Sequence, residues 1–248
     1  MKKALQAILQ RILGFDRYLF WFSLFKINTI RFEGHNKEGD FLHFLGMLNP
    51  NDHVLDIGAN IGIMSVLLAK RCPEGQIHAF EPVEENLKAL RKVVAHHDLP
   101  QVHIHPIALG KDVRKIHMHM PILQGVRMQG LSHVQHETIE GYESDAVQYE
   151  VQQTSLDEWL SKYPHAINAI KMDVENYEQF VLEGGMESLR THRPIIYCEL
   201  WDNENRANCM DILERLGYST QVLIKDMLVP FEAAKHPHHN FFFIPNPA

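Results

Sequence analysis

The sequence predicts an α/β fold in which strands alternate with helices and form a mostly parallel sheet. Short apolar runs alternate with amphipathic stretches from about residue 54 onward, the order typical of such sheets. The first run ends in Asp56 and turns through two glycines into a helix, and the next run ends in Glu81-Pro82 before another helix. Side chains that follow parallel strands meet at one edge of the sheet, so we expect a binding site at that edge.

Composition limits the classes of protein to consider. The chain has 248 residues, of which 45% are apolar and 22% charged, which fits one domain with a large core. Three cysteines without paired spacing favour a reducing, cytoplasmic location. The formal charge of -7 gives no basic surface for nucleic-acid phosphates, so no nucleic-acid partner is expected. The 17 histidines lack the spacing of metal ligands, which favours surface histidines over a metal site.

The apolar strand that ends in Asp56 leads into a glycine turn with the spacing Asp56-x-Gly58-x-x-x-Gly62. Glycine allows positive φ, and the helix predicted from Ile61 to Arg71, starting near Asn60, points its free N–H groups at a bound carboxylate. Asp56 stands before the turn, where it can meet an ammonium group. The rival interpretation is a nicotinamide oxidoreductase. The fingerprint of dinucleotide-binding proteins has a different glycine spacing, which disfavours this rival. The sequence predicts a site for an amino-acid zwitterion joined to a nucleoside, which describes S-adenosylmethionine.

The next two strands complete this predicted cofactor site. Gln76–Phe80 is followed by Glu81, whose carboxylate can accept hydrogen bonds from both ribose hydroxyls, and a helix is predicted to begin near Glu84. A third strand, Val102 to Pro106, runs into 107–110, which we expect to be a loop along the adenine face.

An insertion at about 111–153 is predicted beyond the third strand. Arg114–Met120 and Val147–Gln153 alternate like strands on either side of the polar stretch Leu123–Asp145. Its position over the carboxyl edge of the sheet makes it a candidate lid and acceptor-binding region. A helix capped by Thr154 or Ser155 follows.

The sheet then resumes with strands predicted at Ala169–Glu175 and Pro194–Leu200, separated by a helix from about Tyr177 to Leu189. Asp173 and Glu175 therefore lie at the carboxyl edge beside the first strand, facing the reactive end of the cofactor.

The first 31 residues carry six basic residues and one acid, a net charge of +5, which leaves -12 for the remainder. Apolar residues keep the spacing of one helix face and precede an aromatic cluster at 18–25. The residues of that face are Leu5, Ile8, Leu9, Ile12 and Leu13. No window fits a transmembrane helix or a signal peptide. Two interpretations stay open for this 1–33 extension: a helix packed on the catalytic domain or a partner subunit, or an interfacial helix at the inner face of the membrane.

Five motifs resemble the FkbM family of S-adenosylmethionine-dependent methyltransferases over about residues 50 to 245. They are Val54–Gly62, Phe80-Glu81-Pro82 with Asn86, Ala108-Leu109-Gly110, Ile170–Glu175 with Glu178, and Arg193–Glu199. The Lys-x-Asp-x-Glu block is the most distinctive, and Asn176 follows it where family members usually carry glycine. The resemblance implies a class I methyltransferase, Rossmann-like domain over 34–248. Its sheet would have seven strands with helices on both faces, and Tyr218–Ile224 and Phe241–Ile244 would be the final antiparallel pair.

Together these observations give two sets of candidate site residues. The cofactor candidates are Asp56, Gly58, Asn60, Gly62, Glu81, Asn86 and Ala108. The candidates for a general base that accepts the acceptor's proton are Asp173, Glu175 and Glu199, with His133 as an alternative on the insertion. Asp173, Glu175, Glu199 and Asp202 carry oxygen ligands, but no spacing demands a metal.

The resemblance implies O-methylation of a hydroxyl on a saccharide, glycolipid or related natural product. N- or carboxyl methylation of a small metabolite is an alternative, and like-charge repulsion from the carboxylates disfavours an anionic acceptor. An interaction protein that binds S-adenosylmethionine without catalysis is a second alternative.

Overall fold

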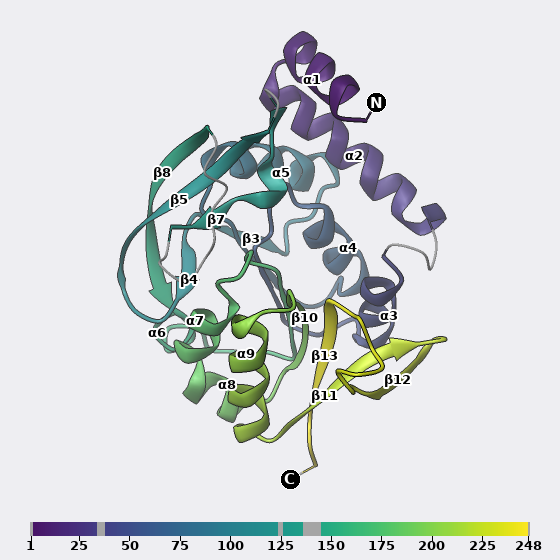
Figure 1. Cartoon of the computed structure of the whole chain (residues 1–248), viewed down its shortest axis with the longest axis vertical. Coiled ribbons are helices and arrows are strands. Elements are labelled where there is room, and N and C mark those ends of the chain that lie inside the picture. The colour runs from purple at the N-terminus through teal and green to yellow at the C-terminus, as the bar shows by residue number, and fades with distance from the viewer. Residues whose placement is uncertain (1, 34–37, 124–125, 136–144, 248) are drawn as a thin grey trace.

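An eight-stranded mixed sheet forms the centre of the structure (Figure 1). The structure, a computed structural model, describes residues 2–33, 38–123, 126–135 and 145–247. The strand order is β12-β11-β13-β10-β9-β1-β2-β3. The bounds are β1 Val54–Ile57, β2 Ile77–Phe80, β3 Val102–His105, β9 Ala169–Met172, β10 Ile195–Glu199, β11 Tyr218–Ile224, β12 Met227–Pro230 and β13 Asn240–Pro245. The five strands from β10 to β3 are parallel, so their carboxyl ends share one edge.

The antiparallel end of the sheet has one strand more than the seven expected. β11 pairs with β13 as predicted, but it also turns back through Lys225 and Asp226 to pair with β12. Both turn residues have positive φ, 49° and 66°, which is the geometry of a two-residue hairpin. Such turns usually carry Asn-Gly or Asp-Gly, so the Lys-Asp pair did not indicate a hairpin at this position in the sequence.

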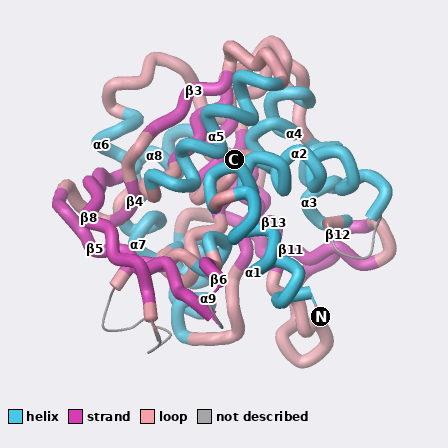
Figure 2. The backbone as a smooth tube through the Cα atoms, turned by 90° about the horizontal axis from the view of Figure 1, so that it is seen from above, coloured by secondary structure: helices cyan, strands magenta, loops and turns pink. Residues whose placement is uncertain are grey.

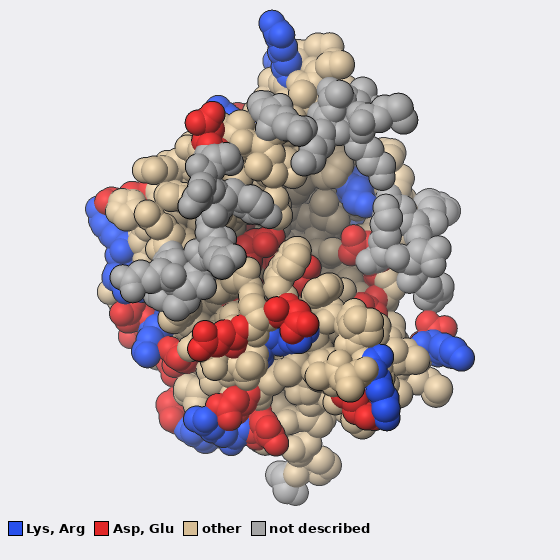
Figure 3. Space-filling model, viewed as in Figure 1, with Lys and Arg blue, Asp and Glu red and all other residues tan. Residues whose placement is uncertain are grey.

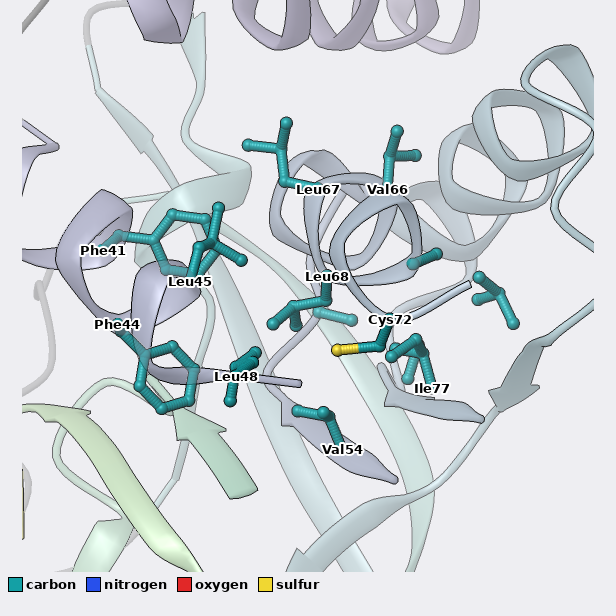
Figure 4. Close-up of a cluster of buried hydrophobic side chains, with 14 of the residues drawn as sticks. Phe41, Phe44, Leu45, Leu48, Val54, Val66, Leu67, Leu68, Cys72 and Ile77 are labelled. Atoms are coloured by element: carbon teal, nitrogen blue, oxygen red, sulfur yellow. The ribbon is translucent and has the colours of Figure 1, made fainter. Parts of the chain in front are cut away.

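Helices cover both faces of this sheet (Figure 2). One face carries α3 Gly39–Met47, α4 Ile63–Arg71 and α5 Glu84–His96, and the other carries α6 Leu156–Leu160, α7 Glu178–Glu183, α8 Met186–His192 and α9 Glu204–Arg215. Figure 4 shows Phe44 of α3 and Cys72, which directly follows α4, within the first core cluster. On β13, Phe242 packs into that cluster, whereas Phe241 and Phe243 pack into the opposite one. This alternation lets a single strand contribute to both cores.

Two helices differ from their predicted bounds. The helix after β1 begins at Ile63 rather than Ile61, because Gly62 has φ 85° and stands outside it as the N-cap. The helix expected from Tyr177 to Leu189 is broken at Gly184 and Gly185 into α7 and α8. The Asp157 carboxylate accepts hydrogen bonds from the first turn of α8, which stabilises the second start. The helix α6 is capped by Ser155, one of the two predicted caps.

A second, five-stranded sheet stands beside the first (Figure 1). It has the order β4-β8-β5-β6, with β7 paired to β5. The bounds are β4 Ala108–Gly110, β5 Arg114–Leu123, β6 Val126–Arg127, β7 His133–Val134 and β8 Ala146–Ser155, and a short 3₁₀ helix spans Gln129–Leu131. The expected loop at 107–110 is therefore partly a strand, since 108–110 pair in parallel with β8. Of the predicted Leu123–Asp145 stretch, 124–125 and 136–144 lie outside the described residues.

The second sheet touches helix α7, which covers the first sheet, through glycine backbone. A Cβ on Gly184, at the end of α7, would lie 2.1 Å from the carbonyl oxygen of Gly110 in β4. No side chain fits between these segments, so α7 and β4 are held in direct backbone contact.

The N-terminal residues form two helices, α1 Lys2–Leu13 and α2 Phe15–Glu33. Leu19, Ile27 and Ile30 bury the inner side of α2, which packs against α4 and α5. The predicted apolar face of α1 is largely exposed: Ile8, Leu9 and Ile12 face solvent, Leu13 is half-buried, and the side chain of Leu5 lies outside the described residues. Within the described chain, no helix is long and apolar enough to span a membrane.

Candidate active site

A cavity opens at the carboxyl ends of β1, β2 and β9, with about 600 Å³ of empty space when the solvent at its mouth is included. Its lining brings together seven of the residues selected from the sequence: Gly58, Asn60, Glu81, Asn86, Ala108, Asp173 and Glu175. The side of the molecule viewed in Figure 3 is hollowed near its centre, with acidic side chains around the hollow. Asp56, Gly62, Glu199 and His133 do not line the cavity.

The glycine turn forms the floor of the cavity and leaves no room for a side chain. Gly58 has φ 78°, and a Cβ there would lie 1.9 Å from the carbonyl oxygen of Asp173. Asn60 also has positive φ, at 51°, and its backbone N–H donates to Glu81 Oε2 at 2.8 Å. The turn is therefore fastened to the acid that follows the second strand.

Glu81 is almost fully buried and organises the centre of the cavity. Its Oε1 accepts hydrogen bonds from the backbone N–H of Val83 at 2.8 Å and from Asn86 Nδ2 at 3.3 Å. Burial nevertheless raises the pKa of Glu81 to about 7, because desolvation outweighs these hydrogen bonds and the charge of Lys171. Among the described residues, the Oδ1 atoms of Asn60 and Asn86 are buried without a hydrogen-bond partner, so they are available to donors on a ligand.

Asp56 lies beneath the cavity rather than in its wall. It is fully buried; its Oδ2 accepts a hydrogen bond from Ser65 at 2.6 Å, and its Oδ1 lies 3.5 Å from Lys171 Nζ. We predicted that Asp56 contacts a ligand's ammonium group directly, but Asp56 is buried and does not line the cavity. The glycine turn separates Asp56 from the cavity, and Asp56 is linked to the cavity residue Asp173 through their shared ion-pair partner Lys171.

Lys171 is a buried cation that sequence reasoning did not select as a site residue. Its Nζ donates to the carbonyl oxygen of Gly58 at 3.1 Å and lies 3.9 Å from Asp173 Oδ2. Burial alone would lower the pKa of Lys171, but the charges of Asp56, Asp173 and Glu199 outweigh it and raise the pKa. The available signal was a lysine inside the otherwise apolar strand Ala169–Met172.

Carboxylates gather where β9 and β10 end. Burial and the charges of Asp173, Glu199 and Glu178 raise the pKa of Glu175 to about 8, and burial with the charge of Asp173 raises that of Glu199 to about 7. Glu175 and Asn176 have φ 53° and 70°, which is the left-handed region of the backbone. Asn tolerates this region, so Asn176 keeps the turn at the position where the FkbM family usually has glycine.

The buried side chain of Glu178 stabilises this turn by hydrogen bonds. It is buried and accepts hydrogen bonds from the Val174 N–H at 3.0 Å and from Asn205 Nδ2 at 2.7 Å. Burial raises its pKa to about 7. Its contacts therefore fix the segment that carries Asp173 and Glu175.

His133 does not reach the cavity, contrary to the lid-borne base considered from the sequence. Ser132 and Val134 line the cavity, whereas His133 is buried with its ring 6.1 Å from that of His119. Successive side chains of a strand point to opposite faces, so Val134 and His133 cannot both face the ligand.

Two histidines, the buried His78 and the half-buried His105, support the wall behind the cavity. Phe80 lines the cavity, and its ring stacks on His105 at 4.7 Å and packs edge-on against Trp159 at 5.0 Å. His105 in turn contacts His78 at 3.0 Å between ring nitrogens. Burial lowers the pKa of His78 to about 3 and that of His105 to about 4. These histidines are packing groups rather than the surface residues expected, and no group of three or more metal-ligating side chains occurs in the described chain.

The sequence model of one protein family, the methyltransferase FkbM domain, matches residues 56–220 of this chain. The chain belongs to this family. A relative of this FkbM methyltransferase is "Methyltransferase 1" of Beauveria bassiana, 24% identical over 194 residues, which cover 73% of this chain and 78% of the relative. The AMB antimetabolite synthetase AmbE of Pseudomonas aeruginosa is 36% identical over 69 residues, 28% of this chain and 3% of that protein.

A solved structure of a methyltransferase FkbM from Methylobacillus flagellatus has the same fold, with a TM-score of 0.53 at 16% identity. The alignment covers 80% of this FkbM methyltransferase but 45% of that protein, so the chain spans less than half of its length. The family match favours methyl transfer over the nicotinamide oxidoreductase considered as a rival.

The cofactor of this FkbM methyltransferase is S-adenosylmethionine, and the cavity fits it. Of the lining residues, Glu81 could hold the ribose hydroxyls, the apolar wall of Phe80, Ile107 and Leu109 could take adenine, and the unpartnered Asn60 and Asn86 oxygens could accept hydrogen bonds from the ligand. Ile107 and Leu109 belong to the segment 107–110 that was expected to lie along adenine, and both line the cavity. Phe80 was not selected from the sequence, because a lone apolar residue cannot be distinguished from a core residue before the fold is known.

Proposed function

We propose that this FkbM methyltransferase transfers the methyl group of S-adenosylmethionine to a hydroxyl of a saccharide, glycolipid or related natural product. The supporting observation is the charge of the cavity: Asp173 and Glu81 line it with acidic groups, the carboxyl group of Glu175 being mostly neutral at pH 7, and no Lys, Arg or His lines it among the described residues. A neutral acceptor meets no repulsion there, whereas an anionic one would. This argument disfavours the carboxyl methyltransferase considered as an alternative.

The bound cofactor supplies an electrophilic methyl carbon on a positively charged sulfur. The protein must hold the acceptor oxygen in line with that carbon and exclude water. Tyr177, Met118 and Val134 give the cavity an apolar upper wall that serves this purpose.

Asp173 is the residue that we assign as general base. It lines the cavity, and its side chain is 38% exposed, so an acceptor hydroxyl can reach it. Its ion pair with Lys171 and the carbonyl contact of Lys171 with Gly58 fix its distance from the glycine turn. The hydroxyl proton would pass to Asp173 as the new C–O bond forms.

Glu175 has a different part in this proposal. Because its pKa is raised to about 8, its carboxyl group is mostly protonated at pH 7 and can donate a hydrogen bond to an acceptor oxygen. Asp173 as a hydrogen-bond acceptor and Glu175 as a hydrogen-bond donor would together orient a hydroxyl group.

The same negative lining also suits a cationic amine, which keeps N-methylation as the second candidate. The two are separated by the product. Untargeted mass spectrometry of glycolipids and polysaccharide, with and without the chain, would reveal a shift of one methylene unit, and NMR of that product would show whether oxygen or nitrogen carries the methyl group.

The test of the mechanism uses Asp173→Asn, with Asp211→Asn as the matched control. Asp211 lies on α9 in an exposed pair with Arg215, remote from the cavity lining. We expect Asp173→Asn to lower kcat about 10²–10⁴-fold, the range for a general base, while S-adenosylhomocysteine still binds in calorimetry. Retained turnover in Asp173→Asn would refute the assignment. Binding without turnover by the unmodified chain on every acceptor fraction would favour the non-catalytic alternative.

A further inference from the structure

The outer surface of the two N-terminal helices exposes a concentration of apolar side chains. Ile8, Leu9 and Ile12 of α1 are 53%, 37% and 74% exposed, and Trp21 and Phe25 of α2 are 59% and 60% exposed. These five are the majority of the eight large hydrophobic side chains that are exposed in the described chain. Ile8 and Ile12, like Trp21 and Phe25, are four residues apart, so each pair shares one helix face. We call these five residues the hairpin stripe.

The exposure does not result from a loosely attached segment. The inner side of α2 is buried at Leu19, Ile27 and Ile30, and Ser23 Oγ donates to the carbonyl oxygen of Ile61 at 3.1 Å. Helix α2 is therefore anchored on α4 and α5 and α1 packs on α2, while the hairpin stripe is exposed to solvent. A fixed apolar surface of this kind marks an interaction site.

Charge indicates what covers it. Exposed Arg17 precedes Trp21 by four residues on α2, and exposed Arg11 stands beside Ile12 on α1. Residues 1–31 carry a net charge of +5 and the remainder of the chain -12. An anionic surface would attract the helices and repel the body, which sets one orientation. A second copy of the chain docked through the same stripe would bring two +5 segments together, which is unfavourable.

We propose that the hairpin stripe rests on an anionic phospholipid bilayer. Trp, Phe and Ile beside arginines are the composition of helices that lie in the headgroup region. The contact is peripheral, because no described helix is long and apolar enough to span the bilayer.

The stripe is connected rigidly to the cavity wall. The Gln10 side chain of α1 makes two hydrogen bonds of 3.3 Å to the backbone of Arg127 in β6, and the Arg127 guanidinium lies 5.1 Å from the centre of the Phe15 ring. Figure 2 shows β6 beside α1. Gln129, two residues after Arg127, lines the cavity. Docking on lipid would thus fix the orientation of the cavity to the bilayer, which suits an acceptor carried on a lipid. This last step rests on the proposed function.

Vesicle co-sedimentation of the full chain tests the proposal. Vesicles of phosphatidylcholine alone are compared with vesicles of phosphatidylcholine and phosphatidylglycerol at low and high salt. We expect binding to the anionic vesicles only, weakened by salt. Arg11→Gln with Arg17→Gln should weaken it about 25-fold, from about fivefold for each basic residue at an anionic surface. Trp21→Ser with Phe25→Ser should abolish it.

The matched control is Val113→Ser with Met227→Ser, which removes two equally exposed apolar side chains from β-rich parts of the body. This control should bind as the unmodified chain does. Calorimetry with S-adenosylhomocysteine checks that each variant is folded. Equal binding to both vesicle types, or unchanged binding by Trp21→Ser with Phe25→Ser, would overturn the proposal. So would a dimer in analytical ultracentrifugation that this double variant dissociates.

These measurements contain no acceptor and no turnover. Failure of hydroxyl methylation would therefore leave the bilayer contact standing, and failure of vesicle binding would leave the methylation chemistry standing.

Discussion

Removal of the buried Lys171 cation should destabilise the whole protein as well as the site. Lys171→Met leaves Asp56 fully buried with its nearest positive charge gone, since their atoms lie 3.5 Å apart. Breaking a buried ion pair by removing one partner costs about 3–5 kcal/mol. Asp173 adds little to this cost, because its side chain is 38% exposed and water can solvate it. We expect a loss of about 3–5 kcal/mol in the free energy of unfolding, and weaker binding of S-adenosylhomocysteine.

Urea denaturation of the single and double variants measures this. Adding Asp56→Asn to Lys171→Met removes the stranded charge, so the double variant should cost about 1–3 kcal/mol less than the sum of the two single variants. Lys162→Met is the control, because Lys162 pairs with Glu158 on the surface and its loss should cost less than about 1 kcal/mol. Single-variant costs that add within about 0.5 kcal/mol would refute the coupling of Lys171 to Asp56.

Two further predictions test the glycine turn and the acid cluster. Gly58→Ala should destabilise the protein by at least about 1–3 kcal/mol and abolish S-adenosylhomocysteine binding, because φ is 78° and Cβ would strike the Asp173 carbonyl. Gly46→Ala, in helix α3 with open space around it, should instead be neutral or stabilising by up to about 1 kcal/mol in the same thermal scans. The pKa of Glu175 is raised to about 8 from its ordinary value of 4.5, so between these pH values the folded state holds a proton that the unfolded state has lost. Stability is therefore greatest below about pH 4.5 for this group and falls toward pH 8, by at most about 1.4 kcal/mol per pH unit. Glu175→Gln should flatten that fall in urea titrations at pH 5 and pH 8, and an unchanged slope would contradict the assignment.

The alternation of strands and helices could be predicted because it depends on local pattern. The bounds of β11, the start of α5 and the Ser155 cap agree with their expectations, since each is set by neighbouring residues. The break at Gly184 depends on tertiary structure, because Asp157 from another element caps the second helix and Gly110 requires the close approach. β12 was missed because its turn lacks the usual glycine.

The positions of the candidate site residues were easier to predict than the directions of their side chains. Glu81 and Asp173 reach the cavity because they directly follow parallel strands. Asp56 also stands at a strand end, but the turn that follows covers it, and Lys171 occupies the space below. His133 and Val134 differ by one position, and only the pairing of β7 with β5 determines which of the two faces the ligand.

The glycine contact between α7 and β4 separates two tasks within one enzyme. Because Gly184 and Gly110 meet backbone to backbone, the spacing of α7 and β4 does not depend on the size of any side chain between them. If the acceptor binds as proposed, substitutions at lining positions of β5 and of the 3₁₀ segment can reshape its enclosure without changing that spacing. An engineer who wishes to change which molecule is modified should therefore vary Met118, Gln129 and Ser132 and leave both glycines intact.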